Sequence, residues 1–343
     1  MTIGQEENPM LSGVALQPVD SPVVFENVVE EIEQSGFDEL WLTDSSLHAR
    51  YVYSYLTLAA RRSSRLQLGT AVTNPITRHP AVTATAATTI DDVSQGRFRL
   101  GIGAGDRPLL ALGSKPATLA RLESSIDAIR QLWTGEHVTM EGTGFKLDDA
   151  HMRAPAERQV PIYISCSGPK TLELAGRVAD GVILLAGLHP EGLQWALNHI
   201  DRGVDAAGKS ERPKITVFAY GAIDDDEEAA FAAGRTIAAW FPQTAPGYCK
   251  MAGLSAELVE KVRTMYEGGE FQEAEDAAKL LPDDFVHRMA LAGGPERARQ
   301  HIKNMMELGI DCISVFPLGD DRFKTMHNFK KTFNEVSKVK NAS

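Results

Sequence analysis

The chain has 343 residues, a formal net charge of −11 and 43% hydrophobic residues. This length allows one large barrel or two ordinary domains, and the acidic balance excludes the basic surface that non-specific nucleic-acid binding requires. No apolar run predicts a membrane span, and the polar, acidic first residues do not predict a signal peptide. The three widely spaced cysteines predict neither a disulfide framework nor a zinc site, so we expect a reducing cytoplasm and no metal.

Short apolar runs alternate with helical segments along the chain. Most of the runs are continuous, which is typical of strands buried on both faces. We expect strands at residues 13–17, 38–43, 66–72, 97–102, 161–165, 181–185, 215–220 and 311–316. We expect helices at 22–35, 51–62, 79–94, 118–133, 171–179, 191–207, 295–308 and 321–336. The first helix shows the local signals best, because Ser21-Pro22 supplies a cap and a first-turn proline and Gly36 ends it.

Two segments interrupt the alternation. Residues 138–140 and 145–147 predict a small surface hairpin, and residues 224–291 predict a helical insertion without a clear strand, bent at Trp240-Phe241-Pro242. Eight strand–helix units point to a (β/α)₈ TIM barrel that forms a single domain over residues 1–343. A doubly wound open sheet is the alternative, but it needs a domain boundary, and the chain has no linker rich in Pro, Gly or Ser.

Polar or glycine-rich segments follow four of the expected strands. They are Asp44-Ser45, Thr73-Asn74, Gly103–Asp106 and Cys166–Lys170. In a parallel barrel the carboxyl ends of all strands face the same opening, where ligand sites collect. We therefore expect these segments to frame one site, with the stretch from Leu66 to Asp106 at its centre.

The carboxylates and glycines of these segments each allow two interpretations. Asp44 could contact a cofactor or substrate, or cap the helix that begins near Arg50. The Gly103–Asp106 loop could place bare backbone against a flat ring, or be a tight loop with positive φ angles; no helix is expected close behind it, so it is not a dinucleotide fingerprint. Asp106 is the best candidate for acid/base chemistry, and Arg107 could pair with it, meet an anionic substrate or face solvent.

The segment after the fifth strand predicts an anion site. Ser167 and Gly168 open a helix whose free N–H groups could hold a phosphate near Lys170, although Ser167 could instead cap that helix. Cys166 is better explained as a small buried thiol than as a nucleophile. Arg78-His79 could contact substrate or simply start the third helix. Together these features predict a ring ligand that carries a phosphate.

Four motifs carry a resemblance to a known family. They are GFDELWLTD at 36–44, LGTAVTNPITRHP at 68–80, GRFRLGIGAGD at 96–106 and ISCSGPKTLELAGRVADG at 164–181. At these residues the chain resembles the bacterial-luciferase-like superfamily of flavin- and deazaflavin-dependent oxidoreductases. The pattern is most similar to the F420-dependent branch of methylenetetrahydromethanopterin reductases.

The resemblance implies a barrel, usually dimeric, that holds the deazaflavin coenzyme F420 across its opening. It implies a non-prolyl cis peptide at Ala71-Val72 that supports the ring, with the phosphate near Cys166, Ser167 and Gly168. Further positions that match cofactor-contacting or catalytic residues are Asp44, Ala104 and Asp106, and weaker candidates for substrate contact are Asn74, His79 and Arg107.

Three positions depart from the family pattern. Ala15 stands where the reductases carry a strand-one Glu, Ser45 replaces a frequent His, and Leu188 replaces a basic residue found in some F420 enzymes. We expect an F420-dependent oxidoreductase that transfers a hydride to or from a C=N or C=O carbon of a small molecule, with Asp106 as proton donor or orienting group. The alternatives are an FMN-dependent monooxygenase on the same fold and a non-catalytic flavin-binding relative.

Overall fold

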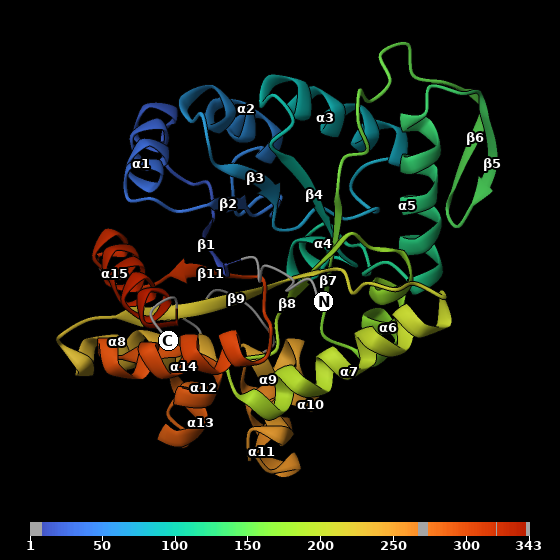
Figure 1. The fold of residues 1–343 in the computed structure, drawn as a ribbon. Helices are drawn as coiled ribbons and strands as arrows, with labels where there is room; N and C mark the ends of the chain where they lie inside the picture. Colours follow the sequence, from blue (N-terminus) through green and yellow to red (C-terminus); the bar gives the residue numbers. More distant parts are fainter. Residues whose placement is uncertain (1–8, 267–273, 320, 341–343) are drawn as a thin grey trace, which may run out of the picture.

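Parallel strands form a closed barrel at the centre of the protein (Figure 1). The computed structural model describes residues 9–266, 274–319 and 321–340, except for the side chains of residues 107, 339 and 340. Within these residues the barrel strands are β1 (Leu11–Leu16), β2 (Glu39–Leu42), β3 (Gln67–Thr70), β4 (Phe98–Ile102), β7 (Ile162–Cys166), β8 (Gly181–Leu184), β9 (Lys214–Ile223) and β11 (Cys312–Pro317). Each pairs with the next, and β11 pairs with β1, which closes the ring. The predicted (β/α)₈ barrel is confirmed.

Helices surround the barrel. They are α1 (Pro22–Gln34), α2 (Val52–Arg62), α3 (Pro80–Val93), α5 (Leu119–Trp133), α6 (Pro169–Val178), α7 (Pro190–Ala206), α14 (Pro295–Glu307) and α15 (Arg322–Lys340). Proline stands in the first turn of α1, α3, α6, α7 and α14, where its missing N–H costs no hydrogen bond. Most of these helices therefore start within one or two residues of the positions predicted from the sequence.

The hairpin and the insertion lie outside this repeat. Strands β5 (Val138–Gly142) and β6 (Phe145–Ala150) pair antiparallel and lie beyond α5 at the edge of the molecule (Figure 1). The insertion contains α8 (Glu227–Ala238), α9 (Phe241–Thr244), α10 (Pro246–Met251), α11 (Ala256–Met265), α12 (Glu275–Ala278) and α13 (Asp283–Met289). Residues 267–273 of the predicted insertion lie outside the described residues.

The expectation that this segment holds no strand is wrong at its end. Strand β10 (Leu291–Gly293) pairs in parallel with residues 221–223 of β9. The reason is that β9 continues to Ile223, beyond the predicted end at Tyr220, and so offers a free edge. A three-residue strand of small and apolar residues has no alternating pattern of its own that would reveal it.

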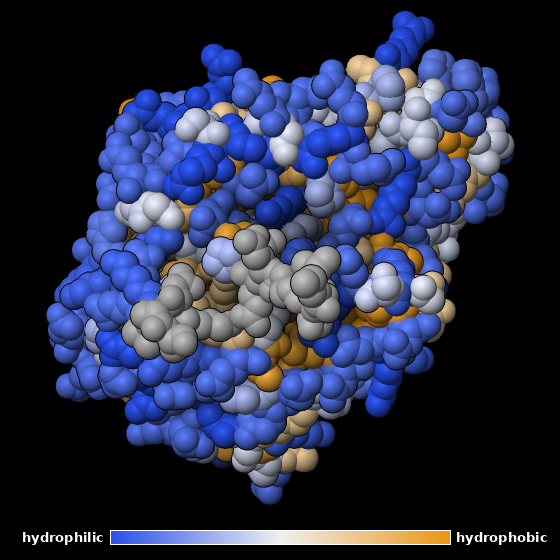
Figure 2. All heavy atoms as spheres, in the orientation of Figure 1, coloured by the Kyte–Doolittle hydropathy of each residue, from blue (hydrophilic) through white to orange (hydrophobic). Residues whose placement is uncertain are grey.

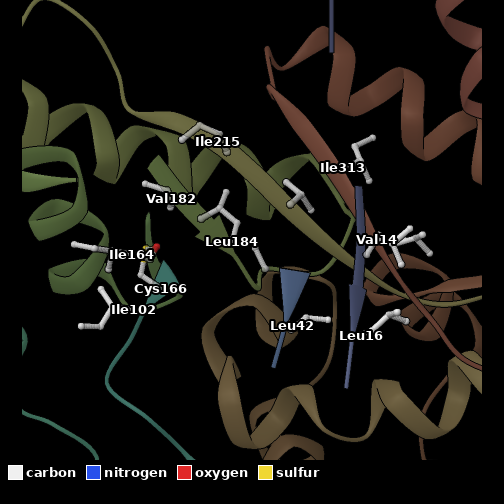
Figure 3. Close-up of a cluster of buried hydrophobic side chains, with 14 of the residues drawn as sticks. Val14, Leu16, Leu42, Ile102, Ile164, Cys166, Val182, Leu184, Ile215 and Ile313 are labelled. Atoms are coloured by element: carbon white, nitrogen blue, oxygen red, sulfur yellow. Dashed lines mark hydrogen bonds between the residues drawn. The ribbon is translucent and has the colours of Figure 1, made fainter. Parts of the chain in front are cut away.

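The barrel strands are buried on both faces. Along β1, Val14 packs outward with the helices and Ala15 packs inward, because successive side chains point to opposite sides of a strand. Outward side chains such as Leu42, Ile164 and Val182 belong to the large core between barrel and helices (Figure 3). A second, interior cluster fills the barrel and includes the rings of Trp41, Tyr163, Phe218 and Tyr220.

His301 of α14 makes folding sensitive to acid. Burial and the nearby Arg297 cation lower the pKa of its imidazole from 6.5 to about 4. Between these two values the unfolded chain takes up a proton at this imidazole that the folded chain does not, so stability falls as the pH falls through this window. We expect a loss of at most about 3.5 kcal/mol, since the two pKa values differ by about 2.5 and a difference of one is worth about 1.4 kcal/mol.

Urea denaturation of the wild type and of His301→Gln at several pH values checks this. The variant should show a smaller loss of unfolding free energy between about pH 7 and pH 4.5 than the wild type. Gln300→Ala on the same helix is the control, because it removes an exposed side chain that does not titrate and should leave the pH slope unchanged. An identical slope for wild type and His301→Gln would contradict the assignment.

Candidate functional site

The loops after β3 and β4 are bonded to each other at the carboxyl end of the barrel, which we call the mouth. Thr73 donates its N–H to the Gly101 carbonyl, and Gly103 donates its N–H to the Thr73 carbonyl, both at 2.9 Å. The Thr70 hydroxyl also donates to the Gly101 carbonyl at 2.6 Å. The predicted centre of the site is therefore a single hydrogen-bonded unit rather than two separate loops.

Small residues form a platform in this unit. The peptide bond between Ala71 and Val72 is cis, as the family resemblance implies. Gly103 is buried, and a Cβ added to it would lie 3.0 Å from Cγ2 of Val72 and 3.5 Å from Cβ of Ser165, so glycine lets the β4 loop pack closely against Val72 and the end of β7. We call Ala71, Val72 and Gly103 the platform; Ala71 and Val72 are partly exposed and could pack against the face of a planar ring, and Gly103 packs against Val72.

An uncrowded helix start lies beside the platform, because β7, which leads into α6, pairs with β4. Gly168 is the N-cap of α6, and a Cβ there would meet nothing within 4 Å. The first turn of a helix presents N–H groups and a positive dipole end to an anion. The site therefore fits a planar ring that carries a phosphate, as a flavin or deazaflavin does.

The predicted phosphate loop is built differently from expectation. Ser167 does not cap α6: its hydroxyl donates to the Thr244 carbonyl at 3.2 Å, which ties the end of β7 to α9. Cys166 belongs to β7 itself, and its side chain is buried beside Ile102 and Ile164 in the outer core (Figure 3). Its thiol donates to the Ile164 carbonyl at 3.7 Å, so any contact that Cys166 makes at the mouth must come from its backbone.

All three thiols should be unreactive in the folded protein. Cys166, Cys249 and Cys312 are free and buried, and burial raises the pKa of each thiol, so the reactive thiolate is scarce. With Ellman's reagent at neutral pH we expect negligible reaction in buffer and a full reaction in urea. Rapid labelling of Cys166 in buffer would contradict its placement in the core.

Asp44 holds a buried ion pair. Its Oδ2 accepts a hydrogen bond from Nη1 of Arg78 at 2.5 Å, and its Oδ1 accepts one from Nη2 at 2.9 Å. The guanidinium lies 5.0 Å from the ring centre of Tyr51 and 5.2 Å from that of Tyr53. Both oxygens of Asp44 are thus engaged by Arg78, and the pair joins the β2 and β3 loops. The alternative that Asp44 caps a helix near Arg50 is wrong, because α2 begins at Val52 with Tyr51 as its N-cap.

Two of the predicted substrate residues make local backbone contacts. The Oδ1 of Asn74 accepts hydrogen bonds from the N–H groups of Ile76 and Thr77, both at 3.0 Å. His79 is exposed, and its Nδ1 accepts from Ala81 N at 3.2 Å as the N-cap of α3. Asn74 therefore shapes the turn after β3, and His79 starts the next helix, one of the two roles expected for it. Any substrate contact by either residue stays a prediction.

A short helix follows the Gly103–Asp106 loop, contrary to expectation. Helix α4 (Arg107–Ala111) starts directly after Asp106, because Pro108 suits a first turn and Leu109 is fully buried beneath Gly105. The carbonyl of Ala104 accepts the N–H of Ala117 at 2.8 Å. Asp106 is exposed at the N-cap position, whereas the side chain of Arg107 lies outside the described residues.

An aromatic group at the mouth escaped sequence reasoning. Tyr220 of β9 stacks on Phe316 of β11, and Trp240 of the insertion packs against Tyr220. The negative charge of Asp106 adds to burial in raising the pKa of Tyr220, which places the Asp106 carboxylate within electrostatic reach of this group. Of these three aromatic residues, only Trp240 carries a local sequence signal, because it lies in the segment that the sequence predicts to bend.

Two positions that depart from the family pattern carry buried apolar side chains. Ala15 is fully buried in the interior cluster of the barrel, and Leu188 is fully buried in the outer core. Among the residues that the structure describes, no group of three or more His, Cys, Asp or Glu side chains could hold a metal ion. No helix in the described ranges is long and apolar enough to cross a membrane.

Comparison with known proteins agrees with this geometry. The profile of the luciferase-like monooxygenase family matches residues 12–312. The 5,10-methylenetetrahydromethanopterin reductase of Archaeoglobus fulgidus is 34% identical over 92% of this chain and 96% of its own length. An F420-dependent glucose-6-phosphate dehydrogenase of Amycolatopsis mediterranei is 30% identical over 87% of this chain and 90% of its own. The solved structure of the coenzyme F420-dependent tetrahydromethanopterin reductase of Methanopyrus kandleri superposes with a TM-score of 0.83 at 25% identity, covering 96% of this chain and 99% of that one.

Proposed function

We propose that this chain, which belongs to the luciferase-like monooxygenase family, is an F420-dependent oxidoreductase. It transfers a hydride between F420 and a C=N or C=O carbon of a small organic substrate. The observation that carries the proposal is the platform, where partly exposed Ala71 and Val72 lie at the mouth and Gly103 packs against Val72. The F420-dependent names of several relatives support the choice of deazaflavin over FMN.

The platform and the start of α6 would hold the coenzyme. The partly exposed Ala71, Val72 and Ala104 would contact its ring, and the helix start at Gly168 would offer N–H groups to its phosphate. F420, when bound, supplies or accepts the hydride, and the protein supplies orientation and excludes water. Cys166 and Ser167 contribute through backbone and through the bond to Thr244, which fixes the loop.

Asp106 is the proposed proton donor or orienting group. It stands at the end of the β4 loop, exposed, and its charge reaches Tyr220 on the opposite wall. Asp44 acts as a positioning residue, since Arg78 occupies both of its oxygens and locks the β2 loop to the β3 loop. Asn74, His79 and Arg107 remain proposed substrate-side residues.

Titration of the purified protein with F420 and with FMN tests the proposal. Tight F420 binding, followed by turnover of a ketone or an imine, supports it. FMN binding with NADH-linked oxygen uptake would favour the monooxygenase alternative, and binding without turnover would favour a non-catalytic relative. Failure of both cofactors to bind below millimolar concentration would overturn the whole assignment.

We further propose one domain that pairs as a homodimer in a reducing cytoplasm. Exposed apolar side chains of Val23, Val24 and Leu47 are 69%, 47% and 73% accessible, and the N–H of Arg50 donates to the Pro18 carbonyl at 2.9 Å, which brings their loops together. Large apolar side chains exposed on neighbouring segments favour an interface there. The buried free thiols suit a reducing compartment.

The substitution Val23→Glu should shift the protein from dimer to monomer in sedimentation experiments. A charge at the centre of an apolar interface loses water without gaining a partner, so it opposes association. Val82→Glu, on the exposed surface of α3, serves as a comparison for added charge alone. A dimer that survives Val23→Glu would contradict this choice of surface.

A further inference from the structure

Three aromatic side chains from distant segments form one wall of the mouth. The ring of Tyr220 lies 4.7 Å from that of Phe316, with the planes 19° apart, and 5.6 Å from that of Trp240. The same interior cluster includes Ala71 and Val72, so this aromatic wall borders the platform. In Figure 2 hydrophobic residues gather in the central part of this face, next to the grey residues.

The aromatic wall offers apolar surface and one hydrogen-bond donor. Phe316 and Trp240 are partly exposed, and Tyr220 is 9% exposed. Burial and the charge of Asp106 raise the pKa of Tyr220, so its hydroxyl stays protonated and can donate a hydrogen bond. The partly exposed neighbours Leu185 and Leu318 add aliphatic surface, so within the described cluster the wall carries no formal charge.

Resting on the proposed function, we propose that the substrate is an uncharged, planar ring compound bound against the aromatic wall. Its ring packs on Phe316 and Trp240, and its carbonyl oxygen or imine nitrogen accepts a hydrogen bond from the Tyr220 hydroxyl. Aromatic side chains provide large, rigid contact surfaces of this kind, and the tyrosine hydroxyl fixes the orientation of the polar atom. Tyr220 thus supplies a polar contact that β1 does not, because β1 carries the apolar Ala15.

A phosphorylated sugar suits this wall poorly. Its phosphate and hydroxyl groups would lose water against aromatic and aliphatic carbon, and each polar group that finds no partner there weakens binding. Some relatives of this chain are F420-dependent glucose-6-phosphate dehydrogenases. The aromatic wall of this chain instead favours an uncharged ring compound over a sugar phosphate.

Isothermal titration calorimetry on the F420-loaded protein tests this. The probes are 2-quinolone, a planar uncharged lactam, and glucose 6-phosphate. We expect 2-quinolone to bind more tightly, and Tyr220→Phe to weaken it about three- to tenfold, the loss of one neutral hydrogen bond. Tyr55→Phe is the matched control, a buried tyrosine of α2 whose hydroxyl donates to the Asp20 carbonyl at 2.6 Å. It should leave the affinity for 2-quinolone unchanged.

Turnover provides the second measurement. For 1-indanone and 3,4-dihydroisoquinoline we expect Tyr220→Phe to raise KM by a similar factor while the affinity for F420 stays unchanged. Absent binding of 2-quinolone, or tighter binding of glucose 6-phosphate, would overturn the substrate class, and an unchanged affinity in Tyr220→Phe would overturn the role of Tyr220. Failure to load F420, seen before either probe is added, would overturn the proposed function and this inference with it.

Discussion

Replacing Arg78 with methionine should lower the free energy of unfolding by about 3–5 kcal/mol, the usual loss when one partner of a buried ion pair is removed. The side chains of Arg78 and Asp44 are only 10% and 4% exposed, and two hydrogen bonds of 2.5 and 2.9 Å join them. Without the guanidinium, the Asp44 carboxylate stays buried with no cation beside it. Urea denaturation at neutral pH measures the loss.

A double substitution separates the pair from the packing of its members. Arg78→Met together with Asp44→Asn removes both charges, so it should recover part of the stability that Arg78→Met alone loses. Lys279→Met is the surface control, because its ion pair with Asp276 is exposed and its loss should leave the free energy of unfolding nearly unchanged. A loss for Arg78→Met as small as that for Lys279→Met would show that the buried pair does not stabilise the mouth.

The Asp44–Arg78 pair also shows where sequence reasoning ends. The repeating strands and helices could be predicted because each rests on local patterns, such as the apolar run of β2 or the proline that starts α3. Asp44 and Arg78 lie 34 residues apart, and no local pattern says that they meet. They meet because neighbouring parallel strands end at the same side of the barrel, which becomes visible only once the register of β2 and β3 is known.

The aromatic wall was hidden for the same reason. Tyr220, Phe316 and Trp240 come from two strands and an insertion, and each alone looks like an ordinary core residue. The cis peptide at Ala71-Val72, in contrast, followed from the family motif and not from any physical pattern in the residues. Strand β10 depends on the free end of β9, so it too needed the three-dimensional structure.

The second large effect is expected at the platform, from Gly101→Ala. A Cβ on Gly101 would overlap the carbonyl oxygen of Thr70 and come within 3.1 Å of Cγ1 of Val72, and backbone cannot move aside as a side chain can. Overpacking of this kind costs about 1–3 kcal/mol or more of stability. Because Thr70 and Thr73 both bond to the Gly101 carbonyl, β3 and the platform must shift with it. We therefore also expect F420 affinity to fall by at least about tenfold, equivalent to about 1.4 kcal/mol.

Two further glycines distinguish a platform effect from the general cost of a methyl group. Gly247→Ala in α10 meets nothing within 4 Å and should leave both stability and F420 affinity intact. Gly103→Ala meets Val72 Cγ2 at 3.0 Å and Ser165 Cβ at 3.5 Å but no backbone atom as close as the Thr70 oxygen is to Gly101, so it should retain more stability than Gly101→Ala. It should still weaken F420 binding, because the added methyl group would displace Val72, which would support the ring. Equal F420 affinity in Gly103→Ala and wild type, measured by coenzyme fluorescence, would place the ring elsewhere in the mouth.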